Sequence, residues 1–442
     1  FKLAKLAKTS PNNIAIQIKS QFDNLSNNEK NFLEGKKVWT KVEIAGNGFI
    51  NLWLNPQIKT QVLFTVVQNN NFGQFLKKEK EKVIIEYVSA NPTGPLHVGH
   101  ARQAVLGDVI SNLIKLSGDQ VCREFYYNDA GNQIENLAMS VYSRLHNINP
   151  SDKLFPQDGY RGNYILDIAK AYEKEKFFER LKNKNKLELI NDIRAFSINH
   201  LRNEQKRDLD LIGVEFDSYK LESSFYQDNS IDSVLKKIEK NNFSYKKDGA
   251  TWLKSTDFGD DKDRVMKKTD GTFTYFVPDI AYHHNKWHRG FVRAINIQGY
   301  DHHGTIKRLK AGLQALNENL PKKYPETVLH KMVKVIKNGI EVKVSKRSGV
   351  YVTLRDLLDW SSSTGIEANK KNKEKDYTVG RDAVRFFLLS KKADSEFSFD
   401  IDLATKKTEE NPVFYVQYAY ARACSLIDQS GNSENNLINK FK

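Results

Sequence analysis

Cysteine is scarce in this chain, whose 442 residues include only Cys122 and Cys424. Two cysteines cannot build a disulfide framework, and they cannot supply a cysteine-based zinc site, which needs more thiolate ligands. The composition therefore fits a protein of a reducing compartment, and we expect it in the cytoplasm.

Long hydrophobic runs are also missing. No apolar stretch approaches the ~18 residues that a membrane-spanning helix needs, so no association with a membrane is expected. The first twenty residues mix basic and apolar side chains without a continuous hydrophobic segment or a small-residue cleavage site. This pattern argues against a signal peptide and favours an amphipathic helix that packs on its own domain.

Positive charge is in excess and unevenly distributed. The formal net charge is +15. Residues 1–41 carry eight lysines against three acidic residues, and residues 307–347 carry eleven lysines and arginines against three. A polyanionic partner such as nucleic acid is the natural inference. A solvated, lysine-rich surface is the alternative that charge alone leaves open.

One segment predicts a nucleotide site. A short β-branched run, Lys82–Val88, is broken by a turn rich in proline and glycine, and helical spacing of apolar residues then continues to Gly118. A strand, a tight turn and a helix start form the geometry that captures phosphate in α/β nucleotide folds. Gly99 lets a ligand approach the backbone, and His97 and His100 can offer ring N–H groups to phosphate.

His97-Val-Gly99-His100 resembles the signature of class I aminoacyl-tRNA synthetases, and its surroundings are similar to the arginyl-tRNA synthetases in particular. A second signature, Lys343-Val-Ser345-Lys346-Arg347-Ser-Gly349, is close to the KMSKS loop of the class. Many arginyl enzymes lack the second lysine of this loop, which is present here as Lys346. The resemblance runs from about Val42 to Arg422, and further matching stretches are residues 123–134, 158–169, 299–304 and 411–422.

The resemblance implies an α/β fold with three domains. Residues 1–75 are expected to form a small α+β domain that binds tRNA. Residues 76–376 are expected to form the Rossmann-type catalytic domain, with a mostly helical insertion at about 130–265. Residues 377–442 would begin an all-α anticodon-binding domain, which continues in the family beyond the end of this sequence.

Local patterns add detail to this division. Gly46 and Gly48 lie at the turn of a predicted strand–turn–strand; half of a dinucleotide fingerprint is the alternative, but a third glycine and a following helix are missing. Further strands are expected at residues 121–127 and 291–298.

The activity implied is ATP-dependent attachment of L-arginine to tRNA(Arg) through an arginyl-adenylate, with release of AMP and pyrophosphate. Such a reaction needs its groups held in line and its phosphate charge stabilised. The catalytic residues implied are His97, His100, Lys343 and Lys346, and Gly99, Gly299, Asp301, His302 and Ser345 complete the ATP site. Mg²⁺ is expected with the nucleotide and not on a protein site of its own; the chain is expected to be a monomer.

Arginine recognition is expected to rest on carboxylates, because a planar guanidinium needs acceptors placed for forked hydrogen bonds. The residues implied at the arginine are Glu86, Ser89, Asn91, Tyr275 and Asp279. Pro278 fits the first position of a helix, which would place Asp279 in its first turn. The ordinary alternatives are a helix-start role for Asp279 and an edge charge for Glu86.

Other functions stay open at this point. One is a class I synthetase for another amino acid, although a cysteine-specific relative would need zinc ligands that two cysteines cannot supply. A second is a nucleotidylyltransferase with the same histidine element, although these are usually shorter. A third, of a different class, is a non-catalytic RNA-binding protein derived from a synthetase. Intact histidines and lysines in both signatures argue against it.

Overall fold

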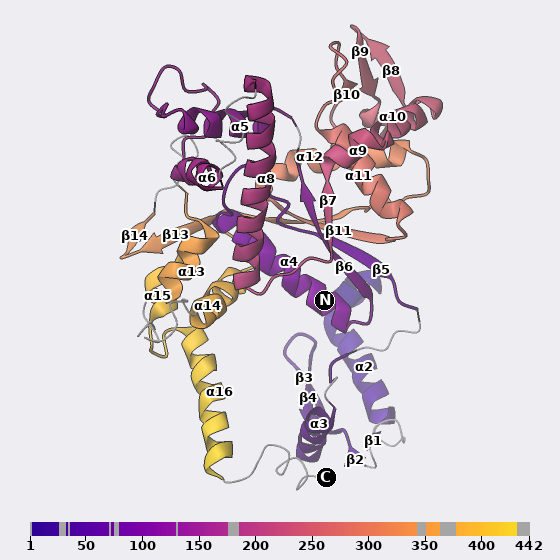
Figure 1. Cartoon of the computed structure of the whole chain (residues 1–442). Helices are drawn as coiled ribbons and strands as arrows, with labels where there is room; N and C mark the ends of the chain where they lie inside the picture. Colours follow the sequence, from indigo (N-terminus) through magenta and orange to yellow (C-terminus); the bar gives the residue numbers. More distant parts are fainter. Residues whose placement is uncertain are drawn as a thin grey trace. The chain divides into compact units, whose positions relative to one another are not determined.

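The computed structural model describes residues 2–25, 32–33, 36–69, 72–74, 79–129, 131–175, 185–342, 351–362 and 377–430 (Figure 1). The predicted site residues Lys343, Ser345 and Lys346 lie outside these ranges. Contacts divide the chain into two compact units, Phe1–Gln74 with Tyr420–Lys442, and Phe75–Ala419. No helix in the described ranges is both long and apolar enough to cross a membrane.

The first unit is built around an antiparallel hairpin. Its elements are α1 (Lys2–Leu6), α2 (Pro11–Leu25), β1 (Phe32–Leu33), β2 (Lys36–Lys37), β3 (Trp39–Ala45), β4 (Phe49–Leu54) and α3 (Pro56–Gln68). The predicted strand–turn–strand is confirmed, with Gly46 and Gly48 at φ 51° and 96° in the turn. Phe22 of α2 packs edge-on against Trp39 of β3, with ring centroids 5.1 Å apart. The N-terminal helices therefore pack on their own domain.

The second unit contains a five-stranded parallel sheet in the order β12-β11-β5-β6-β7. Its strands are β5 (Lys82–Glu86), β6 (Gln120–Tyr127), β7 (Ser218–Leu221), β11 (Arg293–Gly299) and β12 (Glu326–His330). The strands predicted at residues 82–88, 121–127 and 291–298 are confirmed within two residues. In chain order, β6 and β7 add on one side of β5, and β11 and β12 then add on its other side. Ligands bind at the carboxyl ends of the strands where the order reverses.

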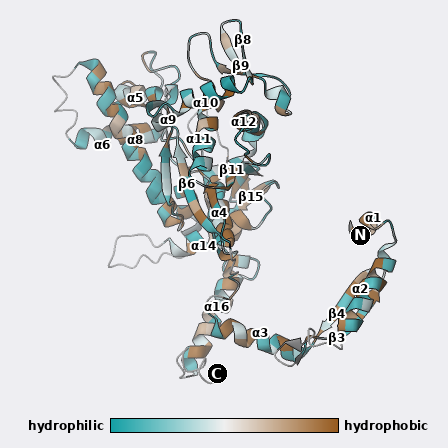
Figure 2. Cartoon of the chain, turned by 90° about the vertical axis from the view of Figure 1, so that its right-hand side faces the viewer, coloured by the Kyte–Doolittle hydropathy of each residue, from teal (hydrophilic) through white to brown (hydrophobic). Residues whose placement is uncertain are grey.

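Helices cover both faces of this sheet. Val83, Ile84 and Ile85 of β5 are fully buried, as expected for a strand with helices on either side. Val83 and Ile85 join the core shared with α4 (Val98–Leu116), whereas Ile84 joins the core shared with α11 (Phe276–His288) and α12 (His303–Ala315). This alternation is the two-residue period of a strand. In Figure 2 the ribbon carries hydrophobic (brown) residues in the region of α4 and β11.

The segment between β6 and β11 forms two groups of elements, which lie apart in Figure 1. The first is a helical group, α5 (Asn132–Leu145), α6 (Asn163–Lys174) and α8 (Lys186–Leu211), with a core of its own. The second contains α9 (Glu222–Gln227), α10 (Ser230–Lys240), β8 (Ser244–Lys247), β9 (Ala250–Leu253), the short η2 (Ser255–Phe258) and β10 (Arg264–Lys267).

The expectation of mostly helical structure over residues 130–265 is wrong for the second part of that stretch. β7 is the fifth strand of the central sheet, and β8, β9 and β10 form a separate antiparallel sheet. These strands have four residues each. So short a run barely shows the two-residue period, which explains why the sequence pattern missed them.

Beyond the sheet, the chain forms η3 (Tyr300–His302), β13 (Val333–Lys337), β14 (Ile340–Glu341), α13 (Leu354–Ser362), α14 (Thr378–Leu389), β15 (Phe397–Asp400), α15 (Ile401–Thr405) and α16 (Pro412–Gln429). β15 pairs in parallel with β13, so the stretch from residue 377, expected to be all-helical, contains a strand. Fully buried Arg102 of α4 donates to the carbonyls of Lys331 (3.0 Å) and Lys392 (2.9 Å). Helix α4 is thereby hydrogen-bonded to the segments that precede β13 and β15.

Gly107 in the middle of α4 offers a test of this packing. A Cβ at Gly107 would overlap the fully buried ring of Tyr87. Despite the better helix propensity of alanine, we expect Gly107→Ala to lower the free energy of unfolding by roughly 1–3 kcal/mol. Gly304→Ala is the matched control, because a Cβ there meets no atom within 4 Å. Urea unfolding measures both, and equal stability of the two variants would show that the Tyr87 ring moves aside freely.

Candidate active site

A cavity of about 1310 Å³ opens at the carboxyl ends of β5 and β11, where the strand order reverses. Predicted site residues from two parts of the sequence, the region of the first signature and the end of β11, line it: Glu86, Ser89, Asn91, His97, Gly99, His100, Gly299, Asp301 and His302. Among the described residues that line the cavity, Tyr275 and Asp279 do not appear. The structure therefore brings together those expected nucleotide residues that it describes and part of the expected arginine set; Lys343, Ser345 and Lys346 lie outside the described ranges.

The two histidines form a reciprocal cap at the start of α4. The backbone N–H of Gly99 donates to Nδ1 of His97 (3.1 Å), and the backbone N–H of His97 donates to Nδ1 of His100 (3.3 Å). Because each Nδ1 accepts a hydrogen bond from a backbone N–H, the hydrogen of each neutral ring lies on Nε2. The rings stack with centroids 3.7 Å apart. Two N–H donors thus accompany the positive end of the helix dipole, an arrangement that suits phosphate.

The residues that follow the second signature are hydrogen-bonded to this histidine turn. The N–H of Val98 donates to the carbonyl of Val352 (3.0 Å), and the N–H of Leu354 donates to that of Leu96 (2.7 Å). The ring of Tyr351 meets His97 edge-on, with centroids 6.1 Å apart. Although residues 343–350 are outside the described ranges, the end of that loop is anchored beside His97.

The turn after β5 has an unusual backbone. Val88 and Ser89 have φ values of 66° and 40°, and a left-handed conformation is rare for a β-branched residue such as valine. Such strain persists where surrounding contacts impose it, often at functional sites. Here Oγ of Ser89 donates to Oε1 of Glu86 (3.0 Å) and accepts from the backbone N–H of Tyr126 (3.2 Å). The turn is therefore fixed against two strands of the sheet.

The continuation of this turn is held by the helical insertion. Gln205 of α8, fully buried, donates to the carbonyls of Asn91 (3.1 Å) and Gly94 (2.9 Å). The side-chain amide of Asn91 donates to Gln133 of α5 (2.6 Å). Helices further along the chain thus set the position of Asn91. Sequence reasoning missed both glutamines: Gln205 lies outside the matching stretches, and Gln133 lies in the stretch 123–134 but was assigned no role.

Glu86 is paired with a lysine that sequence reasoning also missed. Lys286 of α11 is fully buried, and its ammonium donates to Oε2 of Glu86 (2.6 Å) and to Oδ1 of Asn296 (3.3 Å). Burial alone would raise the pKa of Glu86, but the charge of Lys286 and the hydrogen bonds from Lys286 and Ser89 hold it below its ordinary value. Glu86 is therefore a buried, ionised carboxylate and not an exposed edge charge.

His283 completes this network as a neutral ring. Its Nδ1–H donates to the carbonyl of Asp279 (2.8 Å), so its Nε2 accepts from the amide of Asn296 (2.7 Å). Burial, together with the charge of Lys286, lowers the pKa of His283 to about 4. His283 and Lys286 follow Asp279 by four and seven positions, so all three residues share one face of α11. This spacing was the signal available in the sequence.

Asp279 lies in the first turn of α11, as predicted. The helix begins at Phe276, so the prediction that Pro278 is its first residue is wrong; proline is tolerated there because the N–H groups of a first helical turn have no partner in the helix. Burial, then the charges of Glu86 and Glu222, raises the pKa of Asp279 to about 7.

The carboxyl groups of Glu86 and Glu222 therefore act on that of Asp279, as do the cations Lys286 and Arg308. Of the three carboxyl groups, that of Glu86 lines the cavity. Tyr126 donates its hydroxyl to Oε2 of Glu222 (3.0 Å). Tyr275, expected to wall the pocket, precedes α11 with 82% of its surface exposed, so the structure does not bring it to the cavity. The surplus of acid in a buried region suits a cationic ligand.

The pair of Glu86 and Lys286 can be tested by a double-mutant cycle. Lys286→Met leaves a buried carboxylate without its counter-ion, and we expect a loss of about 3–5 kcal/mol in the free energy of unfolding. Adding Glu86→Gln should recover a large part of that loss, because the uncompensated charge is gone. Denaturant unfolding of the four proteins gives the coupling energy. Strictly additive losses would mean that the two side chains do not stabilise each other.

Asp279 predicts a pH-dependent stability. Its folded-state pKa of about 7 exceeds the ordinary value of 3.8, so its contribution is fully present below about pH 4 and is lost as the pH rises through 7. In the absence of arginine, Asp279→Asn should therefore be more stable than the wild type at pH 8, by roughly 1–4 kcal/mol. Its advantage should shrink steadily toward pH 5. Exposed Asp257, changed to Asn, is the control. A pH-independent difference would contradict the raised pKa.

The sequence and the structure both have close relatives among known proteins. Residues 61–400 match the family described as tRNA synthetases class I (R), catalytic domain. The chain is 50% identical over 436 residues to an arginine–tRNA ligase from Herminiimonas arsenicoxydans, covering 97% of this chain and 74% of that protein. It is 51% identical over 405 residues to an arginine–tRNA ligase from Cupriavidus taiwanensis, covering 89% of this chain and 68% of that protein.

Solved structures agree with the sequence relatives. An arginyl-tRNA synthetase from Thermus thermophilus matches with a TM-score of 0.71, over 98% of this chain and 76% of that chain. Its 20% identity makes this a likeness of fold alone. The family match over most of the chain, and relatives that share half of its residues, establish that the chain belongs to the class I tRNA synthetases of the arginyl type.

Proposed function

We propose that the chain attaches L-arginine to tRNA(Arg) in an ATP-dependent reaction that forms an arginyl-adenylate and releases pyrophosphate and then AMP. The observation that carries the proposal is the cavity itself. It combines an anion-binding helix start, capped by His97 and His100, with the lining carboxylate of Glu86, whose charge acts on the buried carboxyl group of Asp279. One end suits a triphosphate and the other suits a guanidinium.

At the nucleotide end, the protein supplies charge and position and no nucleophile. The Nε2–H groups of His97 and His100 suit the phosphate oxygens, and Gly99 lets the phosphate approach the helix start. Asp301, at the end of β11, is the residue we assign to the ribose hydroxyls, with Gly299 and His302 beside it. These roles rest on the cavity lining and on the family resemblance.

Lys343 and Lys346 are assigned to the phosphate charge that develops in the transition state, and Ser345 to the same loop. The anchoring of residues 351–354 beside the histidine turn supports this assignment, because it fixes where the loop returns. Mg²⁺ would arrive with the nucleotide, since Mg²⁺ is typically held by substrate phosphates, water and one or two carboxylates, and we assign no protein site of its own to it.

At the arginine end, charge balance supports the assignment of Asp279 and Glu86 to the guanidinium. Lys286 keeps Glu86 ionised, whereas burial, and then the charges of Glu86 and Glu222, raise the pKa of Asp279. A guanidinium would favour the ionised form of Asp279, so arginine binding should release a proton and strengthen as the pH rises through 7. Ser89 and Asn91 are assigned to the amino and carboxylate groups of arginine, and Tyr275 to the pocket wall after side-chain movement.

The tRNA partner is supported by charge. The net charge of +15 suits a polyanion, and we assign the unit that contains residues 1–74 to tRNA outside the anticodon. We propose that the enzyme acts as a monomer in the cytoplasm. Its two cysteines are free thiols, and the cytoplasm keeps such thiols reduced.

The activity is tested by charging total tRNA with each of the twenty amino acids, where arginine alone should be accepted. Asp279→Asn then tests specificity. Asn replaces an acceptor oxygen by an NH₂ group that faces the guanidinium's own donors. For a desolvated pair this should cost on the order of 3–5 kcal/mol, or roughly 10²–10³ in kcat/KM for arginine.

ATP binding, measured separately, should be nearly unchanged in Asp279→Asn, and Asp257→Asn should match the wild type in both assays. A variant that charges arginine within a few-fold of the wild type would reduce Asp279 to a helix-start residue. Selectivity would then have to lie with Glu86. Charging of another amino acid in place of arginine would contradict the proposed function itself.

A further inference from the structure

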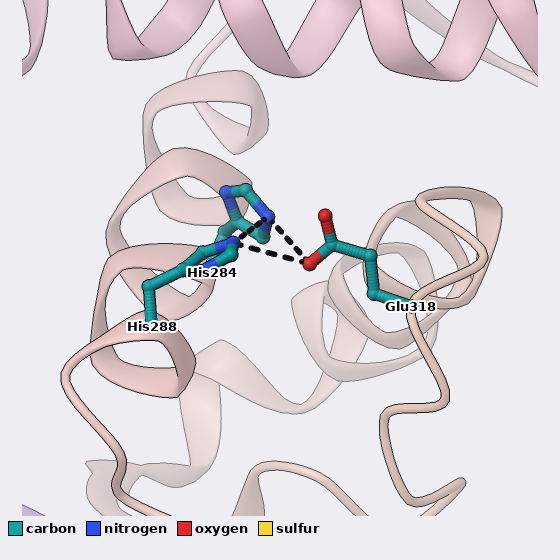
Figure 3. A group of neighbouring side chains, drawn as sticks. All are labelled: His284, His288 and Glu318. Carbon is teal, nitrogen blue, oxygen red and sulfur yellow. Dashed lines mark hydrogen bonds and ion pairs between the residues drawn. The ribbon is translucent and has the colours of Figure 1, made fainter.

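Three side chains with metal-ligating atoms converge away from the cavity, at the carboxy-terminal end of α11 (Figure 3). Nε2 of His284 lies 2.8 Å from Oε2 of Glu318, and Nε2 of His288 lies 3.2 Å from the same oxygen. The two Nε2 atoms are 2.8 Å apart. Three potential ligand atoms therefore form a tight triangle, with one nitrogen from each ring.

The local fold presents these groups together. His284 and His288 are four residues apart on α11 and so share one face of the helix, whereas Lys286 and His283 face the network of Glu86. Glu318 lies in the connection between α12 and β12, flanked by Asn317 and Asn319 in left-handed conformations (φ 53° and 58°).

Hydrogen bonds fix that connection before any ligand arrives. The side-chain amide of Asn241 donates to the carbonyls of Ala315 (3.0 Å) and Leu316 (2.9 Å). The amide of Gln314 donates to the carbonyl of Leu320 (3.1 Å). Glu318 is therefore presented to the histidines by an ordered turn and not by a loose loop.

Hydrogen bonding alone does not satisfy this triangle. Each Nε2 carries at most one hydrogen, which can point along only one edge. If both rings donate to Glu318, the two N–H groups face each other across the contact between His284 and His288. If one ring donates to the other, the accepting nitrogen faces the carboxylate lone pair to lone pair. Whatever the charge of the rings, one close contact remains repulsive, whereas a central cation would satisfy all three atoms.

We infer that His284, His288 and Glu318 bind a divalent transition-metal ion, with Zn²⁺ as the best fit. Two imidazole nitrogens and one carboxylate oxygen form a donor set typical of zinc, with water as a fourth ligand. Zinc bonds of about 2.0–2.2 Å place tetrahedral ligand atoms about 3.3–3.5 Å apart. The two shorter edges of the triangle must therefore widen by about 0.5–0.7 Å, and the edge from His288 to Glu318 by about 0.1–0.3 Å. His288 has 57% of its side chain exposed and is free to move by that amount.

Lys237 of α10 fits this arrangement as an orienting partner. Its ammonium forms an ion pair with Oε1 of Glu318, so Oε2 is the oxygen that faces the histidines. Such bonds to the outer oxygen of a ligating carboxylate are common around metals. Lys237 has 38% of its side chain exposed and can turn toward water as the ion's charge enters.

The consequence of the site is mechanical. A bound ion would tie the end of α11 to the connection before β12. Because the other face of α11 carries Lys286 against Glu86, the ion would steady a helix that supports the cavity. This inference needs no arginine chemistry, and it stands or falls separately from the proposed function.

The test uses the full chain without a histidine tag, stripped with a chelator and titrated with Zn²⁺ by calorimetry. We expect one equivalent to bind and, at about one hundred times Kd, a rise in Tm of roughly 3–5 °C. Co²⁺ in place of Zn²⁺ should give the visible absorption of a four-coordinate ion with nitrogen ligands.

His288→Ala and Glu318→Gln should each weaken Zn²⁺ binding at least tenfold and abolish the rise in Tm. His146→Ala is the matched control, because His146 is also an exposed histidine at the end of a helix, and it should bind like the wild type. Failure of the wild type to bind Zn²⁺ would overturn the site. Unchanged binding in His288→Ala, or an equal loss in His146→Ala, would overturn it as well.

Discussion

The ion pair of Lys286 and Glu86 is the interaction on which the cavity depends. Two charges taken out of water are tolerated only when each is well compensated, and here the lysine has no other carboxylate bonded to it among the described residues. The pair joins β5 to α11, and through Ser89 it reaches the strained turn that leads to the histidines. One buried contact thus links α11 and the cavity-lining Glu86 to the turn that leads to His97 and His100.

Order in the rim comes from elements that are distant in the sequence. The turn that carries His97 and His100 is fixed by its own capping hydrogen bonds and by backbone hydrogen bonds to Val352 and Leu354, which follow the second signature. The turn before it is held by Gln205 of the insertion. The insertion is therefore part of the site's support, and a change in its helical packing would reach Asn91 without touching any ligand.

Much of the site could be predicted from sequence because its chemistry is carried by short contiguous motifs. The histidines, their glycine and the strand before them follow from local spacing, and the strands of the central sheet follow from β-branched runs. Local spacing could not assign roles to Lys286, Gln205 or Gln133, because their contacts with the site form only when elements distant in the sequence pack together. The short strands β7 to β10 escaped for a different reason, since four residues barely reveal a two-residue period. Tyr275 was predicted from the family resemblance, but its side chain is exposed, because matching a family position does not fix where a side chain points.

The strand order also has a consequence for synthesis of the chain. β5 is the central strand, yet its partner β11 begins about 200 residues later. At the usual pace of translation, roughly 10–40 s pass between the two. During that interval one edge of a strand with three consecutive apolar residues, Val83–Ile85, has no native partner, which makes it a site for wrong pairing. The nascent chain is therefore most vulnerable while the insertion is being made, and helices that fold early within the insertion would shorten the search for β11.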